Sequence, residues 1–163
     1  MVLDDAEPRA VAALYGDGSD PARTHRLESD RLLTWVTLGP PVAGERAAWA
    51  RTSARAHAEW PLVEAVVRMV LREDRIAQAR VVLGGVANTP IRAPGVEAAL
   101  VGQPLTHEVL DSAAARASEG ASPLPSTAYK VGLLAPTVLD ALHRAMDMPG
   151  AEVPDLRPHS EAP

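Results

Sequence analysis

The chain changes its hydrophobic pattern once, and this change limits the folds that it can adopt. Between Leu62 and Leu83 apolar residues recur at every second position, which is the period of a half-buried strand. A Gly-Gly pair at 84–85 and the turn formers Asn-Thr-Pro at 88–90 follow. After Pro94 apolar residues recur at helical spacing until about Met146. Strands followed by helices predict an α+β domain.

Three segments are expected to form an antiparallel sheet, at 49–55, 62–71 and 76–83, with a hairpin turn at 72–75. Three helices are expected to follow, at 94–101, 106–119 and 126–146. Thr106 is the expected N-cap of the second helix, and Pro136 is expected to kink or restart the third. The predicted fold class is α+β, with a three-stranded antiparallel sheet packed against a small three-helix bundle.

The ends of the chain are predicted to be less regular. Residues 4–14 suggest a short helix, and 15–21 are dense in turn formers. Residues 32–38 are rich in β-branched and apolar side chains, and they stop at Gly-Pro-Pro, so they are expected to form a strand. Four prolines and several acidic residues from 149 onward predict a disordered tail over 150–163.

Composition excludes several classes of function. The 163 residues suffice for one domain with a buried core. A net charge of −5 disfavours nucleic acid as a partner. The absence of cysteine excludes disulfides, thiolate nucleophiles and a cysteine-held iron–sulfur cluster in this chain. No apolar run approaches the ~20 residues of a membrane helix, and the start lacks a secretory signal. We therefore expect a cytoplasmic protein with no membrane partner.

The residues offer little chemistry of their own. Gly16-Asp-Gly18 is interpreted as a turn, because no strand precedes it and no third glycine opens a helix behind it. The five histidines lack the spacing of metal ligands, so no metal site is predicted. No catalytic residue can be assigned either. The Gly84-Gly85 pair favours a bulge or a close backbone approach over direct contact with a cofactor.

Four stretches nevertheless form a specific set in order and spacing. They are LYGDGSDP at 14–21, LESDRLLT at 27–34 with LGPP at 38–41, EWPLVEA at 59–65, and ARVVLGGVANTPIRA at 79–93 with YKV at 129–131. Together they resemble the C-terminal domain of the FAD-binding medium subunit of molybdopterin hydroxylases, the xanthine dehydrogenase and carbon monoxide dehydrogenase family. The resemblance covers about residues 11–147. Arg31 and Gly39 depart from it, standing where the family has an acid and a proline.

The resemblance implies a role in an oxidoreductase. In that family FAD passes electrons from iron–sulfur clusters to an acceptor, and this domain covers one side of the isoalloxazine ring. The implied partners are a molybdopterin-binding large subunit and a 2Fe-2S small subunit. The glycine-rich loops that hold FAD precede these stretches in the family, and only about ten residues precede Val11 here. The isolated chain is thus expected to bind FAD weakly or not at all, and a further partner chain would carry the missing FAD-binding half.

The resemblance also implies a division of the chain and three cofactor-binding residues. Residues 1–40 would be a remnant of the FAD-binding region with its crossover strand, 41–149 the flavoprotein C-terminal domain, and 150–163 the tail. Leu33 would touch the flavin, Arg51 would lie near its polar edge, and Glu59 would lie beside the ring. Strand core for Leu33 and solvent-facing charge for Arg51 remain open.

Two other function classes compete with this flavoprotein role. One is a non-catalytic interaction or scaffold module that keeps the fold without the flavin. The other is a stand-alone binder of small molecules on an exposed sheet face.

Overall fold

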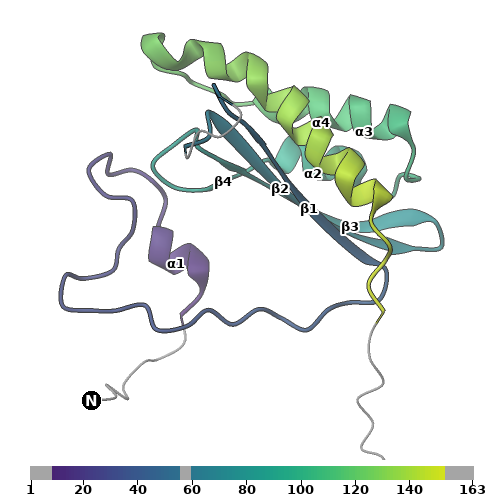
Figure 1. The fold of residues 1–163 in the computed structure, drawn as a ribbon, viewed down its shortest axis with the longest axis horizontal. Coiled ribbons are helices and arrows are strands. Elements are labelled where there is room, and N and C mark those ends of the chain that lie inside the picture. Colours follow the sequence, from purple (N-terminus) through teal and green to yellow (C-terminus); the bar gives the residue numbers. More distant parts are fainter. Residues whose placement is uncertain (1–8, 56–59, 153–163) are drawn as a thin grey trace, which may run out of the picture.

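The computed structural model describes residues 9–55 and 60–152, and its centre is an antiparallel sheet. The sheet has four strands in the order β1 (Glu45–Thr52), β2 (Val63–Arg72), β3 (Arg75–Gly84) and β4 (Ile91–Arg92). Figure 1 shows it nearly edge-on. The α+β class is confirmed, and so is the hairpin of β2 and β3.

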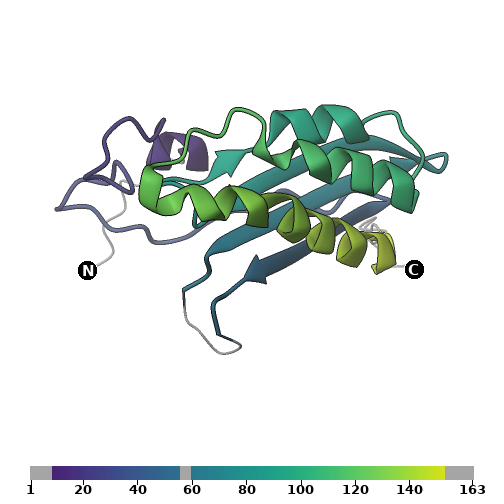
Figure 2. The ribbon, with the colours of Figure 1, turned by 90° about the horizontal axis from the view of Figure 1, so that it is seen from above.

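Helices cover one face of this sheet. They are α2 (Pro94–Leu100), α3 (His107–Ala114) and α4 (Val131–Asp147), with 3-10 turns at Ala115–Ser118 and Pro125–Lys130 between α3 and α4. A further short helix, α1 (Val11–Tyr15), lies apart from this layer. Figure 2 shows α3 and α4 lying across the sheet. The N-cap prediction is confirmed, because Thr106 Oγ1 accepts from the Val109 amide at 3.4 Å.

The core lies between the helices and one face of the sheet. Its members are aliphatic, as expected for a chain without Phe: Val63, Val67, Met69, Val81, Val96, Leu100, Leu110, Val138 and Leu142 are all fully buried. Full burial of such a side chain contributes roughly 1.5–3 kcal/mol, so this layer carries much of the stability.

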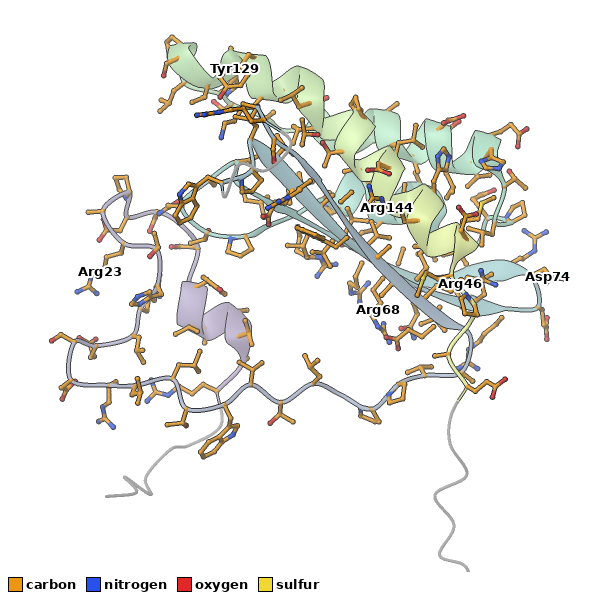
Figure 3. The ribbon with its side chains drawn as sticks, in the orientation of Figure 1. Arg23, Arg46, Arg68, Asp74, Tyr129 and Arg144 are labelled. Carbon is orange, nitrogen blue, oxygen red and sulfur yellow. The ribbon has the colours of Figure 1, made fainter. Side chains whose placement is uncertain are left out.

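The hairpin of β2 and β3 depends on an unusual turn. Glu73 and Asp74 have φ of 51° and 60°, so both central residues adopt the left-handed conformation of a type I′ turn. That turn matches the twist of the two strands and lets them pair closely. Asp74 marks the exposed tip of the hairpin in Figure 3.

Two strand predictions were wrong. The sheet has four strands rather than three, because Ile91 and Arg92 pair with Leu83 and Val82 as β4. Two residues are too few to show a period. Residues 32–38 form no strand; their side chains are exposed, Leu32 by 81% and Leu38 by 85%. A β-rich sequence becomes a strand only where a ladder partner lies beside it.

Smaller differences concern element ends. β1 begins at Glu45 rather than at residue 49, and α4 runs through Pro136 without interruption. The expected helix at 4–14 lies partly outside the described residues, and the expected tail lies mostly outside them. Within the part of the chain that the structure describes, no helix has the length and apolar character needed to span a membrane.

Candidate functional site

The face of the sheet turned away from α2, α3 and α4 is the candidate site, and we call it the open face. Strand pairing places Trp49, Val66 and Val82 in one row across β1, β2 and β3. Trp49 and Val66 are each 47% exposed, whereas their neighbours along the strands point into the core. The row therefore forms a narrow apolar strip in the middle of a solvent-facing sheet.

Charged residues flank the strip on both sides. Arg51 and Glu64 are direct cross-strand partners on one side, and Arg68 and Arg80 are partners on the other. The Arg51 guanidinium carbon lies 5.6 Å from the centre of the Trp49 ring, which is a cation–π contact. The open face thus presents an aromatic surface with a cation held against it.

Other arginines hold the start and the middle of β1. Arg68 donates to Glu45 at 2.7 Å, and this hydrogen bond, opposed by partial burial, lowers the pKa of the Glu45 carboxyl. Arg144 on α4 contacts the Trp49 carbonyl at 3.5 Å and pairs with Asp140 at 2.8 Å. Figure 3 shows Arg68 on the open-face side and Arg144 beside α4. These contacts hold the strand that carries Trp49 and Arg51.

The Gly-Gly pair at the end of β3 serves packing. A Cβ at Gly84 would lie 3.1 Å from Glu64 Oε2, and one at Gly85 would lie 3.2 Å from the Leu62 carbonyl oxygen. Gly85 also has φ of +71°, a conformation that glycine adopts without strain. Lys130 Nζ donates to the Gly85 carbonyl at 2.6 Å. The sequence favoured a bulge or a close backbone approach at this pair. The structure shows a close approach, between Gly85 and the segment that leads into β2.

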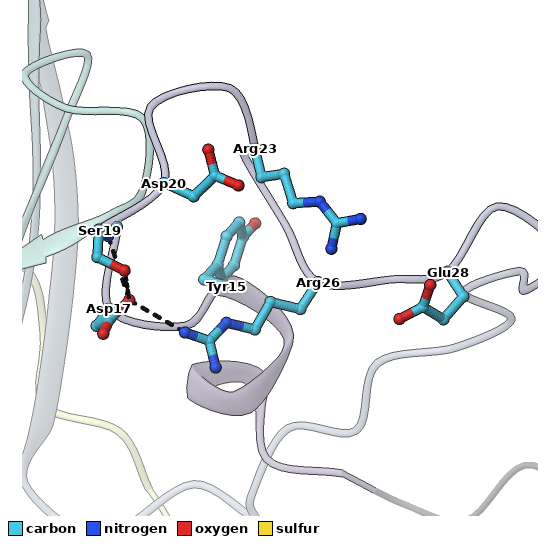
Figure 4. Close-up of a pocket in the computed structure, with 8 residues that line it drawn as sticks. Tyr15, Asp17, Ser19, Asp20, Arg23, Arg26 and Glu28 are labelled. Carbon is cyan, nitrogen blue, oxygen red and sulfur yellow. Dashed lines mark hydrogen bonds and ion pairs between the residues drawn. The ribbon is translucent and has the colours of Figure 1, made fainter.

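A hollow in the loop after α1 is the second candidate site (Figure 4). Its lining includes Tyr15, Asp17, Arg23 and Arg26, and it encloses about 270 Å³. Hydrogen bonds from Ser19, and then the charge of Arg26 at 3.0 Å, lower the pKa of Asp17. Three carboxylates and two guanidiniums line this hollow, and Asp17 with Arg26 is the one ion pair among its lining residues.

The loop is tied to the connection between β3 and β4. Asn88 Nδ2 donates to the carbonyls of Asp20 and Arg23 at 2.7 and 2.9 Å. Gly16 and Gly18 both have positive φ, and Gly16 directly follows α1. These positions are turns, as predicted. The Asn-Thr-Pro stretch therefore anchors the N-terminal segment.

The three predicted cofactor-binding residues have different outcomes. Arg51 lies on the open face against Trp49. Leu33 lies in the extended segment that crosses on the open-face side of the sheet, where its side chain is 53% exposed. Glu59 lies outside the described residues. The role of all three in binding a cofactor remains a prediction.

Sequence reasoning missed the strip itself. The alternation of β2 identified Val63, Ala65, Val67 and Met69 as one face, and the opposite face was available from the same pattern. Trp49 was the signal that could have revealed the strip. A large aromatic side chain on the solvent-facing side of a strand does not serve the core, so it points to a contact surface. Among the described residues, no three His, Cys, Asp or Glu side chains are grouped as metal ligands.

Comparison with known proteins points to one family. A family model described as the CO dehydrogenase flavoprotein C-terminal domain matches residues 49–145. A search of curated protein sequences finds no match.

Three solved structures have the same fold over about two thirds of this chain. A chain of carbon monoxide dehydrogenase from Hydrogenophaga pseudoflava has 28% identity and a TM-score of 0.57, covering 64% of this chain and 37% of its own. Reconstituted CO dehydrogenase from Oligotropha carboxidovorans has 24% identity and a TM-score of 0.56, and the match covers 65% of this chain and 38% of the other. Quinoline 2-oxidoreductase from Pseudomonas putida 86 has 22% identity and a TM-score of 0.57, and the match again covers 65% of this chain and 38% of the other. The chain thus spans well under half the length of these relatives.

Proposed function

Because the chain belongs to the CO dehydrogenase flavoprotein C-terminal domain family, we propose that it is part of the FAD subunit of a molybdenum hydroxylase-type oxidoreductase. In this role it covers one side of a flavin whose diphosphate is held by a different polypeptide segment. The unit at 41–149 supplies the cover, and 1–40 leads to it. In this proposal the chain is a non-autonomous part of a xanthine dehydrogenase-like or carbon monoxide dehydrogenase-like oxidoreductase, and the assembly is cytoplasmic.

The observation that carries the proposal is the open face. Its strip of Trp49, Val66 and Val82 is apolar, and Trp49 and Val66 are each 47% exposed, which suits contact with a planar ring system. FAD would supply hydride and single-electron chemistry when bound. The fit concerns the ring alone, since polyanion recognition needs backbone donors in glycine-rich loops.

The chain's own residues would position and tune the ring. Arg51 is already held over Trp49, so its charge needs little ordering on binding. A fixed cation beside the polar edge of the ring favours the reduced, more anionic state. Leu33 would approach from the crossover segment and exclude water, and Glu59 would lie at the rim. The implied partners are a molybdopterin-binding large subunit, a 2Fe-2S small subunit and a chain with the FAD-binding half.

The test is purification of the chain from its own cells under non-denaturing conditions. We expect flavin absorption near 450 nm, molybdenum and iron to elute with the chain, and the chain purified alone to be colourless. Elution of the chain without flavin or metals would contradict the proposal and favour the scaffold module. A yellow isolated chain would contradict the requirement for a second FAD-binding segment.

A matched pair of variants tests the role of Arg51. In the purified assembly, Arg51→Gln should lower the flavin reduction potential, because it removes a cation next to the ring. Arg75→Gln serves as the control, since Arg75 lies at the far end of β3, beside the hairpin turn. Equal potentials in the two variants would count against Arg51 as a flavin neighbour.

A further inference from the structure

Two histidines from different helices meet on the layer that covers the sheet. His107 is the first residue of α3, and His143 lies in α4. The distance from His107 Nδ1 to His143 Nε2 is 3.3 Å. Their ring centres are 5.0 Å apart with the planes at 75°. The open face plays no part in this pair, because α3 and α4 lie on the opposite side of the sheet (Figure 2).

We propose that this pair is a binding site for a divalent transition-metal ion of the Zn²⁺ type. Two nitrogens bound to one tetrahedral zinc, each about 2.0–2.1 Å from the metal, lie roughly 3.3–3.4 Å apart. The observed separation of 3.3 Å therefore already equals the separation in the bound state. In the metal-free pair one of these two nitrogens carries the shared proton. Binding requires that imidazole to adopt its other tautomer, with the proton on its opposite ring nitrogen, and both rings to turn so that the two lone pairs point at one ion.

The surroundings allow an ion to reach the pair. His107 is exposed and His143 is partly exposed, so the pair lies at the surface. The net charge of −5 favours the approach of cations. Imidazole prefers zinc, copper and nickel, whereas magnesium and calcium prefer oxygen ligands. The site therefore selects for the first group.

The site is open rather than closed. Because the described residues hold no group of three candidate ligands, water completes the coordination. A structural zinc site usually has four protein ligands, so the ion here exchanges more readily. The bound ion links the start of α3 to the second turn from the end of α4. It binds the folded state selectively, since unfolding separates the two helices, and it therefore stabilises the fold.

The experiment is a titration of the full chain with Zn²⁺, followed by calorimetry and by thermal unfolding. We expect one equivalent to bind and to raise the melting temperature, with reversal by EDTA and no effect of Mg²⁺. His107→Ala and His143→Ala should each weaken binding at least tenfold and abolish the rise. His25→Ala is the matched control, because it removes an exposed loop imidazole, and it should bind like the wild type.

Two results of the titration would overturn the proposal. One is unchanged Zn²⁺ affinity in both His107→Ala and His143→Ala. The other is an equal loss in His25→Ala. Unfolding without metal shows whether each variant still folds. As a second readout, the electron paramagnetic resonance spectrum of bound Cu²⁺ should show two coupled nitrogens in the wild type and one in each variant. A single coupled nitrogen in the wild type would also overturn the proposal.

Discussion

Glu97 shows how one buried carboxylate joins three parts of the fold. It is 7% exposed in the first turn of α2, it accepts from the Val81 amide at 2.9 Å, and it pairs with Arg92 of β4. Burial alone would raise the pKa of Glu97. The hydrogen bonds from Arg92 and Val81, with the charges of Arg92 and Arg80, outweigh it and lower the pKa.

Glu97→Gln should therefore lower the free energy of unfolding by about 1–3 kcal/mol at pH 7. Because the folded-state pKa is depressed, the ionised group stabilises the fold above the unfolded pKa. That stability is lost as the pH falls through the folded pKa. Chemical denaturation at pH 7 and below pH 4 should thus show a smaller difference for the variant than for the wild type.

The control is Glu119→Gln, which breaks an exposed pair with Arg116. Such surface pairs contribute about 0–1 kcal/mol, so this variant should keep most of the wild-type dependence on pH. If both variants lost the pH dependence of the unfolding free energy to the same extent, Glu97 would have no special role in that dependence.

Gly85→Ala should be more destabilising than Gly102→Ala. Both glycines have positive φ, 71° and 83°, which costs an alanine roughly 1–2 kcal/mol. Only at Gly85 would the new Cβ also crowd backbone oxygens, at 3.2 and 3.3 Å, whereas nothing lies within 4 Å at Gly102. Thermal unfolding of the two variants measures the difference. Equal melting temperatures would mean that the close approach relaxes without cost.

Helix α4 and the crossover segment at 27–42 should differ strongly in their response to the same Leu→Ala truncation. Leu142→Ala empties a fully buried site in α4 and should cost about 2–5 kcal/mol. Leu32→Ala removes a side chain that is 81% exposed, and it should change stability by less than about 0.5 kcal/mol. Denaturant midpoints of the isolated chain give both values. A large loss for Leu32→Ala would show that the crossover segment packs on something.

The elements differ in how far the sequence could predict them. β2 and β3 were predictable because ten-residue alternation and a polar turn are local signals. β4 was not predictable, because its two residues form a strand only through their pairing with β3. Residues 32–38 have strand composition, yet the pairing that would make them a strand is a tertiary property. At the open face, Trp49 and Arg51 are two residues apart and share a face, whereas nothing local relates Leu33 to them.

Within the described residues, one segment exposes a run of large apolar side chains. Leu32, Leu33, Trp35, Val36 and Leu38 are between 53% and 85% exposed, and they follow one another along the crossover. Contiguous apolar surface of this kind marks a contact site. We therefore predict that the chain self-associates, or that it depends on a partner chain carrying the FAD-binding half.

Sedimentation at tens of micromolar tests this prediction. The double variant Trp35→Ser, Leu38→Ser should shift an associated wild type toward monomer. Trp60→Ser is the control, because Trp60 is 84% exposed but lies outside the crossover. A wild type that is a clean monomer at these concentrations would contradict the prediction.

The meeting of the two ends of the sheet-and-helix unit has a consequence for its evolution. Gly44 donates to the Ala151 carbonyl at 3.1 Å, and Ala151 donates to the Glu45 carbonyl at 2.8 Å. Arg46 reaches the carbonyls of Met146 and Met148 from the same place. A unit whose entrance and exit are adjacent can be moved between longer polypeptides, or circularly permuted, without reopening its core. This folding unit is therefore portable, and fusion, fission and transfer among multidomain chains would leave its interior intact.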